Sequence, residues 1–174
     1  FLDHANYAGD DFTGIFIDAL NNLACAPGIP AFQVRYQGND GIVDHPLGQP
    51  WVDEPYDRQR KVPWTEMMKQ YAHVDLFCVT HRESAGLGVI EAASSGATVV
   101  VPTAGTPFIA RELLNDTLPH RTTALTAAAV RQIIGDLLVQ GIDRQANHDC
   151  VSKAHDWSLA AQRIAATVTS MARN

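Results

Sequence analysis

The chain has 174 residues, of which 46% are hydrophobic and 18% charged, so it can bury a core of its own as one globular domain. Its formal net charge is −6, which argues against nucleic acid and against anionic membrane surfaces as partners. The 3 cysteines form no CxxC pair, so we expect no zinc site and no disulfide framework, and a reducing compartment. No apolar run is long enough for a transmembrane segment.

Strand and helix patterns alternate along the first part of the chain, as in a parallel α/β sheet. Residues 1–2 are expected to end a strand, and helices are expected over 14–25 and 65–73. A strand is expected over 31–36, whereas residues 38–60, rich in Gly, Pro and Asp, are expected to form a long loop. The continuous apolar run VDLFCVT, residues 74–80, is typical of a strand buried on both faces.

The pattern continues with a helix over 87–95 that ends before Gly96, a residue favoured as a left-handed cap. The β-branched run TVVV, residues 98–101, predicts the next strand, and Pro107 suits the first turn of a helix over 107–114. From about residue 118 the chain reads as helical, with helices expected over 126–140, 143–154 and 158–172. The sequence therefore predicts one Rossmann-like domain over 1–174, with helices on both faces of a parallel sheet and a helical tail.

The loop that follows residues 74–80 has the residue types that suit a phosphate ligand. Ligands bind at the carboxyl ends of parallel strands, and this loop carries Glu83 and Gly86 before a helix that begins near Leu87. The N–H groups at a helix N-terminus attract a diphosphate, and glycine lets the backbone come close to it. The carboxylate of Glu91, one turn into the helix, can accept both vicinal hydroxyls of a ribose.

The segment ESAGLGVIE resembles the E-x7-E motif of retaining GT-B glycosyltransferases, and is most similar to glycosyltransferase family 4, the group 1 transferases. Glu83, Gly86, Leu87 and Glu91 fall on positions of that motif, whereas the two residues after Glu83 depart from the family's glycine and aromatic residue. The similarity extends over about residues 62–172, through MMKQYAHVDLFCVTHRE, SSGATVVVPTAGTP and HDWSLAAQRI. The first sixty residues match poorly.

The resemblance implies that the chain is the C-terminal, donor-binding half of a longer two-domain GT-B enzyme. Such an enzyme transfers a sugar from a nucleoside diphosphate donor to an acceptor with retention of configuration. Glu83 would act at the reacting centre as the catalytic residue, and Glu91 would hold the ribose. The resemblance further implies no cofactor and no metal, an acceptor bound by the missing N-terminal domain, and no activity in the isolated chain. The protein would be cytoplasmic and would meet the inner membrane only through that missing domain.

Further donor-binding positions follow from the same resemblance. The amides of Gly86 and Leu87 would take the diphosphate, while Gly105 and Thr106 would line the sugar pocket. The indole of Trp64 would lie near the family's base-binding position, and Arg82 or Lys61 is a candidate for the cation beside the diphosphate. Besides Glu91, the donor-binding positions that the resemblance implies are therefore Gly86, Leu87, Gly105, Thr106, Arg82 and Trp64.

Two departures from the family pattern leave alternatives open. The family's early Arg and Lys have no counterpart in GDDFTGI, where Thr13 stands in place of Lys, and Phe108 stands where glutamate is usual. A catalytically degenerate donor-binding domain and a nucleotide-sugar epimerase are therefore alternative hypotheses. An NAD-binding domain is disfavoured because no G-x-G-x-x-G follows the first strand, and the absence of D-x-D disfavours a metal-dependent transferase.

Overall fold

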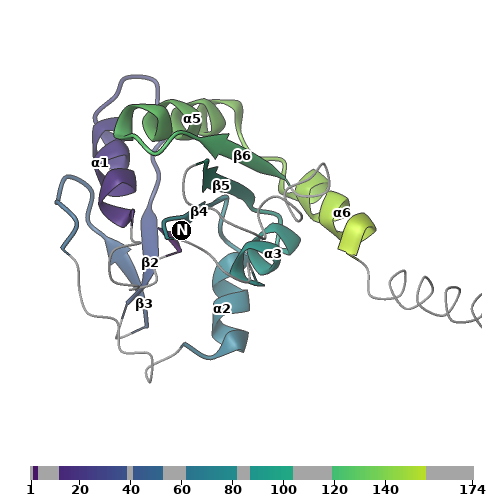
Figure 1. The fold of residues 1–174 in the computed structure, drawn as a ribbon. Helices are drawn as coiled ribbons and strands as arrows, with labels where there is room; N and C mark the ends of the chain where they lie inside the picture. Colours follow the sequence, from purple (N-terminus) through teal and green to yellow (C-terminus); the bar gives the residue numbers. More distant parts are fainter. Residues whose placement is uncertain are drawn as a thin grey trace, which may run out of the picture.

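The structure is a computed structural model, which describes residues 2–3, 12–38, 41–52, 62–81, 87–103 and 119–155. Within these ranges the chain forms an α/β domain with a six-stranded sheet of order β3-β2-β1-β4-β5-β6 (Figure 1). The strands are β1 (Leu2–Asp3), β2 (Val34–Gly38), β3 (Gly41–His45), β4 (Leu76–Val79), β5 (Thr98–Pro102) and β6 (His120–Thr123). The helices are α1 (Thr13–Ala24), α2 (Trp64–Tyr71), α3 (Leu87–Ser94), α5 (Ala127–Gln140) and α6 (Arg144–His155).

The topology of the sheet has a reversal beside β1. β1 is parallel to both β2 and β4, β4 to β5, and β5 to β6, whereas β3 is antiparallel to β2. The chain therefore runs outward from β1 to β2 on one side, and from β4 to β6 on the other. In such sheets the carboxyl ends of the two strands at the reversal leave room for a ligand. This order is compatible with a Rossmann-like fold.

Helices cover both faces of the sheet, in agreement with the sequence-based expectation. Successive side chains of a strand point to opposite faces, and β4 divides its residues accordingly. Phe77 and Val79 pack with α2, α3 and α6 in one core, while Cys78 packs with α1 and α5 in the other. Figure 1 shows α1 beside α5 on one side of the sheet, and α2 beside α3 on the other. The result is a three-layer domain.

Two edge strands correct the sequence-based expectations. β3 lies inside the stretch 38–60 that was expected to be a loop, and β6 lies where only helices were expected. β2 begins at Val34, three positions after the predicted start. The sequence of β6, HRTT, has no apolar run that would predict a strand, and more of its positions are exposed than buried. Pairing with the neighbouring strand stabilises these segments, and a single sequence does not reveal that pairing.

The helix α6 holds α2 and α3 at their carboxyl ends. The guanidinium of Arg144 donates hydrogen bonds to four backbone carbonyls, those of Tyr71, Ala72, Val74 and Ser95. Asn147 and His148, one turn further along, contact the carbonyls of Gly96 and Ser94. The last carbonyls of a helix have no partner within the helix, so these bonds satisfy groups that would otherwise need water. They also fix α2 against α3, the two helices that carry the candidate site.

Candidate functional site

The predicted base-binding and ribose-binding residues meet in the structure. Trp64 is the first residue of α2, and Glu91 lies one turn into α3. The indole Nε1 of Trp64 donates a hydrogen bond of 2.8 Å to Oε1 of Glu91. α2 precedes β4 and α3 follows it. Both helices run antiparallel to β4, so their first turns lie at the carboxyl edge of the sheet. The two residues are 27 positions apart in sequence, and the sequence predicted no direct contact between them.

Exposure distinguishes the two partners. Trp64 is 63% exposed although it is a large apolar side chain, whereas Glu91 is half-buried. An indole usually buries its ring, so a ring that stands in solvent while its N–H is bound offers a fixed aromatic face. The carboxylate of Glu91 is in turn oriented by a neutral donor that leaves its negative charge in place.

Behind this pair, α3 packs against two aromatic rings. The rings of Tyr71 and Phe77 meet edge to face, with centroids 5.6 Å apart. A Cβ added at Gly88 would lie 3.5 Å from the Tyr71 hydroxyl oxygen and 3.6 Å from the Phe77 ring, so α3 packs closely on both rings at this point. The sequence analysis did not identify Tyr71. Its position four residues after the buried Met67 on a short amphipathic helix is the signal that could have identified it as core.

A polar cluster lies at the reversal between β1 and β4. Thr80 directly follows β4, and its hydroxyl accepts a 3.0 Å hydrogen bond from the hydroxyl of Thr13 at the start of α1. Both threonines and the adjacent His81 are buried. The N-terminus of α1 is therefore anchored to the carboxyl end of β4, where a parallel sheet binds its ligands.

The side chain of Thr13 is buried at the start of α1. It is 0% exposed and bonded to Thr80, so the substitution of the family's Lys by Thr13 does not by itself mark a lost phosphate contact. A lysine at this position would bury its charge rather than extend it toward a diphosphate.

Several predicted site residues lie outside the part of the chain that the structure describes. Leu87 is the first residue of α3, as expected, although only its backbone is described. The predicted helices over 107–114 and 158–172 and Phe108 also lie outside the described residues. The same holds for the catalytic residue and four donor-binding positions, namely Glu83, Arg82, Gly86, Gly105 and Thr106.

Within the described ranges, no group of three or more His, Cys, Asp and Glu side chains is placed to hold a metal ion. No helix in the described part of the chain has the length and apolar character needed to cross a membrane. Burial raises the pKa of the Cys78 thiol from its usual range to about 11, so this cysteine stays protonated at neutral pH and is a poor nucleophile.

Comparisons with protein-family models, with curated proteins and with solved structures found no match to this chain.

Proposed function

We propose that the carboxyl edge of this sheet binds the nucleoside part of a nucleoside diphosphate-sugar. In this proposal Glu91 accepts the ribose hydroxyls, and Trp64 orients Glu91 and offers its exposed ring to the base. The observation that carries the proposal is the 2.8 Å hydrogen bond from the indole of Trp64 to the carboxylate of Glu91. It joins Trp64 and Glu91, which the family resemblance places near the base and at the ribose.

The chemistry of the carboxylate supports this role. A carboxylate has about four lone-pair sites on its two oxygens, and the Trp64 indole takes one of them. Two vicinal hydroxyls need two more acceptor sites, which Glu91 can supply without losing its contact with Trp64. Hydrogen bonds to an ionised group are stronger than those between neutral groups, so a preoriented carboxylate favours ribose over a sugar that lacks one hydroxyl.

The position of α3 supports a diphosphate next to the ribose. α3 begins at Leu87, directly after the loop that follows β4, and Glu91 lies on the first turns of the same helix. The N–H groups and the positive end of the dipole at this terminus attract phosphate oxygens, even in a chain of net charge −6. A ligand whose ribose contacts Glu91 would carry its diphosphate toward Leu87.

We extend the proposal to the whole protein as the donor half of a retaining glycosyltransferase of the GT-B type. The resemblance of ESAGLGVIE to the E-x7-E motif supports this extension, with Glu83 as the catalytic residue. The second candidate is a donor-binding domain without catalysis, which Phe108 favours because it stands where the family usually has glutamate. Both candidates bind the donor, and only the first turns it over when an acceptor domain is present.

A thermal-shift panel of UDP-, GDP- and ADP-sugars tests the shared claim. A ligand at a hundred times its dissociation constant stabilises the folded state by about 2.7 kcal/mol. In a domain of this size that corresponds to a rise in Tm of roughly 5–11 °C. We expect one nucleotide series to produce this rise in the wild type, and Glu91→Gln to reduce it because the neutral amide loses the charge-assisted contacts.

The matched control is Glu66→Gln, which makes the same change on α2, where Glu66 hydrogen-bonds to Gln70 of its own helix. This variant should respond to the nucleotide as the wild type does. If no nucleotide sugar shifts the Tm of the wild type, or if both variants respond alike, the Glu91 site is not a nucleotide site.

A further inference from the structure

A network of hydrogen bonds joins α6 to the two residues of the proposed nucleoside site. Ser95 directly follows α3, and its backbone N–H and its hydroxyl both donate to the carbonyl oxygen of Glu91, at 3.1 and 3.0 Å. The carbonyl oxygen of Ser95 in turn accepts a 2.6 Å hydrogen bond from Arg144 of α6. Ser95 is therefore the single residue that connects the Arg144 guanidinium to Glu91.

The same guanidinium reaches the other residue of the site through α2. It donates hydrogen bonds of 3.3 and 2.8 Å to the carbonyl oxygens of Tyr71 and Ala72, the last residue of α2 and the one after it. α2 has 8 residues, so its first residue, Trp64, lies about 10 Å along the helix axis from this end. The 2.8 Å bond from the Trp64 indole to Glu91 completes the network, which thus runs from Arg144 along both helices.

Tyr71 also links the end of α2 to α3 through its side chain. Its buried ring meets Phe77 edge to face, and a Cβ added at Gly88 of α3 would lie 3.5 Å from its hydroxyl oxygen. Gly88 lies three residues before Glu91 on the same helix. A displacement of Tyr71 would therefore also displace the part of α3 that carries Glu91.

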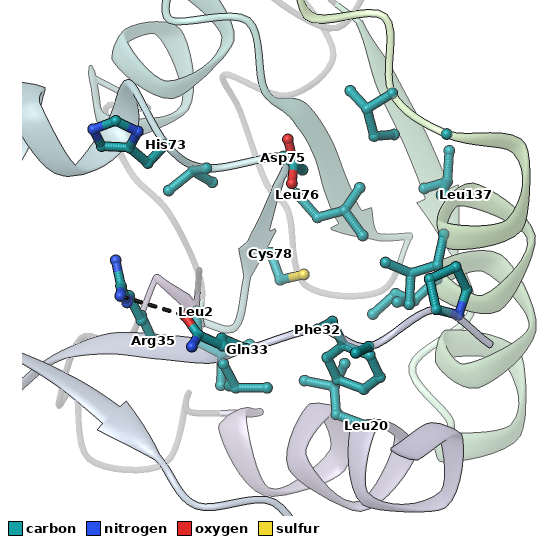
Figure 2. Close-up of a pocket in the computed structure, with 18 residues that line it drawn as sticks. Leu2, Leu20, Phe32, Gln33, Arg35, His73, Asp75, Leu76, Cys78 and Leu137 are labelled. Atoms are coloured by element: carbon teal, nitrogen blue, oxygen red, sulfur yellow. Dashed lines mark hydrogen bonds between the residues drawn. The ribbon is translucent and has the colours of Figure 1, made fainter. Parts of the chain in front are cut away.

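Arg144 is further attached to the turn that leads into β4. Its guanidinium donates to the carbonyl oxygen of Val74, and it lies 3.6 Å from the carboxylate of Asp75, which directly precedes β4 (Figure 2). A guanidinium is planar and has five N–H donors, so it can bond several carbonyls in fixed directions. One side chain thus fixes the ends of α2 and α3 relative to each other and to the central strand β4.

We infer that Arg144 is a positioning residue of the nucleoside site, which acts through Ser95 and α2 to place the Glu91 carboxylate for the ribose hydroxyls. This inference rests on the proposed function of Glu91. A binding group must be held within about 0.5 Å of its productive position. Hydrogen bonds weaken beyond about 3.2 Å, so a relative shift of α2 and α3 by about half an ångström already weakens the 2.8 Å bond that orients Glu91. Arg144 thereby controls how well the site distinguishes ribose from deoxyribose.

The NMR signal of the Trp64 Nε1–H tests the link in the absence of any nucleotide. Trp64→Phe identifies the signal, which is then compared in the wild type, Arg144→Ala and Leu137→Ala. Leu137 is buried in the core that α1 and α5 form on the other face of the sheet, so its truncation lowers stability without changing the contact between α2 and α3. The signal should shift in Arg144→Ala and stay in place in Leu137→Ala. Arg144→Lys, whose ammonium can bond one helix end, should shift it less, and this variant keeps the test decisive if Arg144→Ala does not fold.

Calorimetry with UDP, GDP and ADP, each beside its 2′-deoxy counterpart, tests the effect on ribose recognition. The wild type should bind one ribonucleotide at least about tenfold more tightly than its 2′-deoxy counterpart, because the counterpart lacks one hydrogen bond to a charged group. In Arg144→Ala this preference should fall by about threefold or more. Leu137→Ala should keep the preference, since a loss of stability alone affects both nucleotides equally.

The outcomes separate this inference from the proposed function. An indole signal that stays in place in both Arg144 variants would overturn the inference, and so would an unchanged ribose preference in them. Equal changes in Leu137→Ala would also overturn it, because they would mean that any loss of stability has this effect. A wild type that binds none of the nucleotides would overturn the nucleoside site itself, whereas the nucleotide-free indole signal would still decide whether Arg144 positions Glu91.

Discussion

Replacing Arg144 with alanine would release α6 from the ends of α2 and α3. The guanidinium donates hydrogen bonds of 2.8 and 2.6 Å to the Ala72 and Ser95 carbonyl oxygens. The contact with Asp75 is longer, at 3.6 Å, and this aspartate is largely exposed, so the ion pair adds little. The carbonyl bonds are therefore the interactions whose loss should be measured.

The expected loss in the free energy of unfolding of Arg144→Ala follows from the number and the exposure of these bonds. A hydrogen bond to a charged group contributes about 1.5–3 kcal/mol net. The bonds share one side chain that is 27% exposed, so they do not add fully and water replaces part of them in the variant. We expect Arg144→Ala to lower the free energy of unfolding by about 3 kcal/mol, which corresponds to a drop in Tm of roughly 6–12 °C.

Urea unfolding followed by circular dichroism measures this free energy. The control is Arg131→Ala on α5, which removes the same atoms at an exposed position and should change stability by less than about 0.5 kcal/mol. Arg144→Lys should fall between the two, because one ammonium cannot span carbonyls on separate helices. A loss below about 1 kcal/mol in Arg144→Ala would refute the reasoning, because it would mean that water satisfies these carbonyls as well as the guanidinium does.

Three further predictions probe single features of the fold. Gly96→Ala should cost at least about 2 kcal/mol in urea unfolding, because Gly96 has φ +97° and the added Cβ would lie 2.6 Å from the Arg144 carbonyl oxygen; a neutral outcome would contradict that contact. Between pH about 9 and about 11 the Cys78 thiol ionises only in the unfolded chain, so the stability of the wild type should fall with rising pH across that window. Cys78→Ala should lack that fall, whereas the exposed Cys25→Ala should retain it. Thr13→Lys should lower the Tm strongly without tightening nucleotide binding, because it places a charge at a fully buried position. Calorimetry showing tighter binding would contradict this, because it would mean that residue 13 faces the ligand.

The central strands and their helices could be predicted because local features of their own sequences, apolar runs and a terminating glycine, determine where they form. β4 and β5 are buried on both faces, so their continuous apolar runs predict them without knowledge of the neighbouring strands. The helix over 87–95 is found as α3, and its end was predictable from Gly96, which adopts the positive φ that glycine favours. Local chemistry was sufficient for these elements.

The edge strands of the sheet and the bonds from Arg144 to the ends of α2 and α3 could not be predicted in the same way. β3 depends on antiparallel pairing with β2, in which Arg35 and Asp44 form an exposed ion pair across the strands. The bonds of Arg144 reach residues 49 to 73 positions away. For the candidate site, the sequence identified Trp64 and Glu91 as separate candidates, whereas their direct bond depends on how α2 and α3 pack.

The indole NMR signals of the three tryptophans give the most direct test of the nucleoside site. Trp64→Phe identifies the Trp64 Nε1–H signal, and titration with the nucleoside diphosphate selected by the thermal-shift panel follows it. Because this N–H is bonded to Glu91, a ribose that engages Glu91 should shift the Trp64 signal in proportion to binding. The signal of Trp51, whose ring packs against Tyr36 at β2, should stay in place. A Trp64 signal that stays unmoved at saturating nucleotide would contradict the assignment of this site.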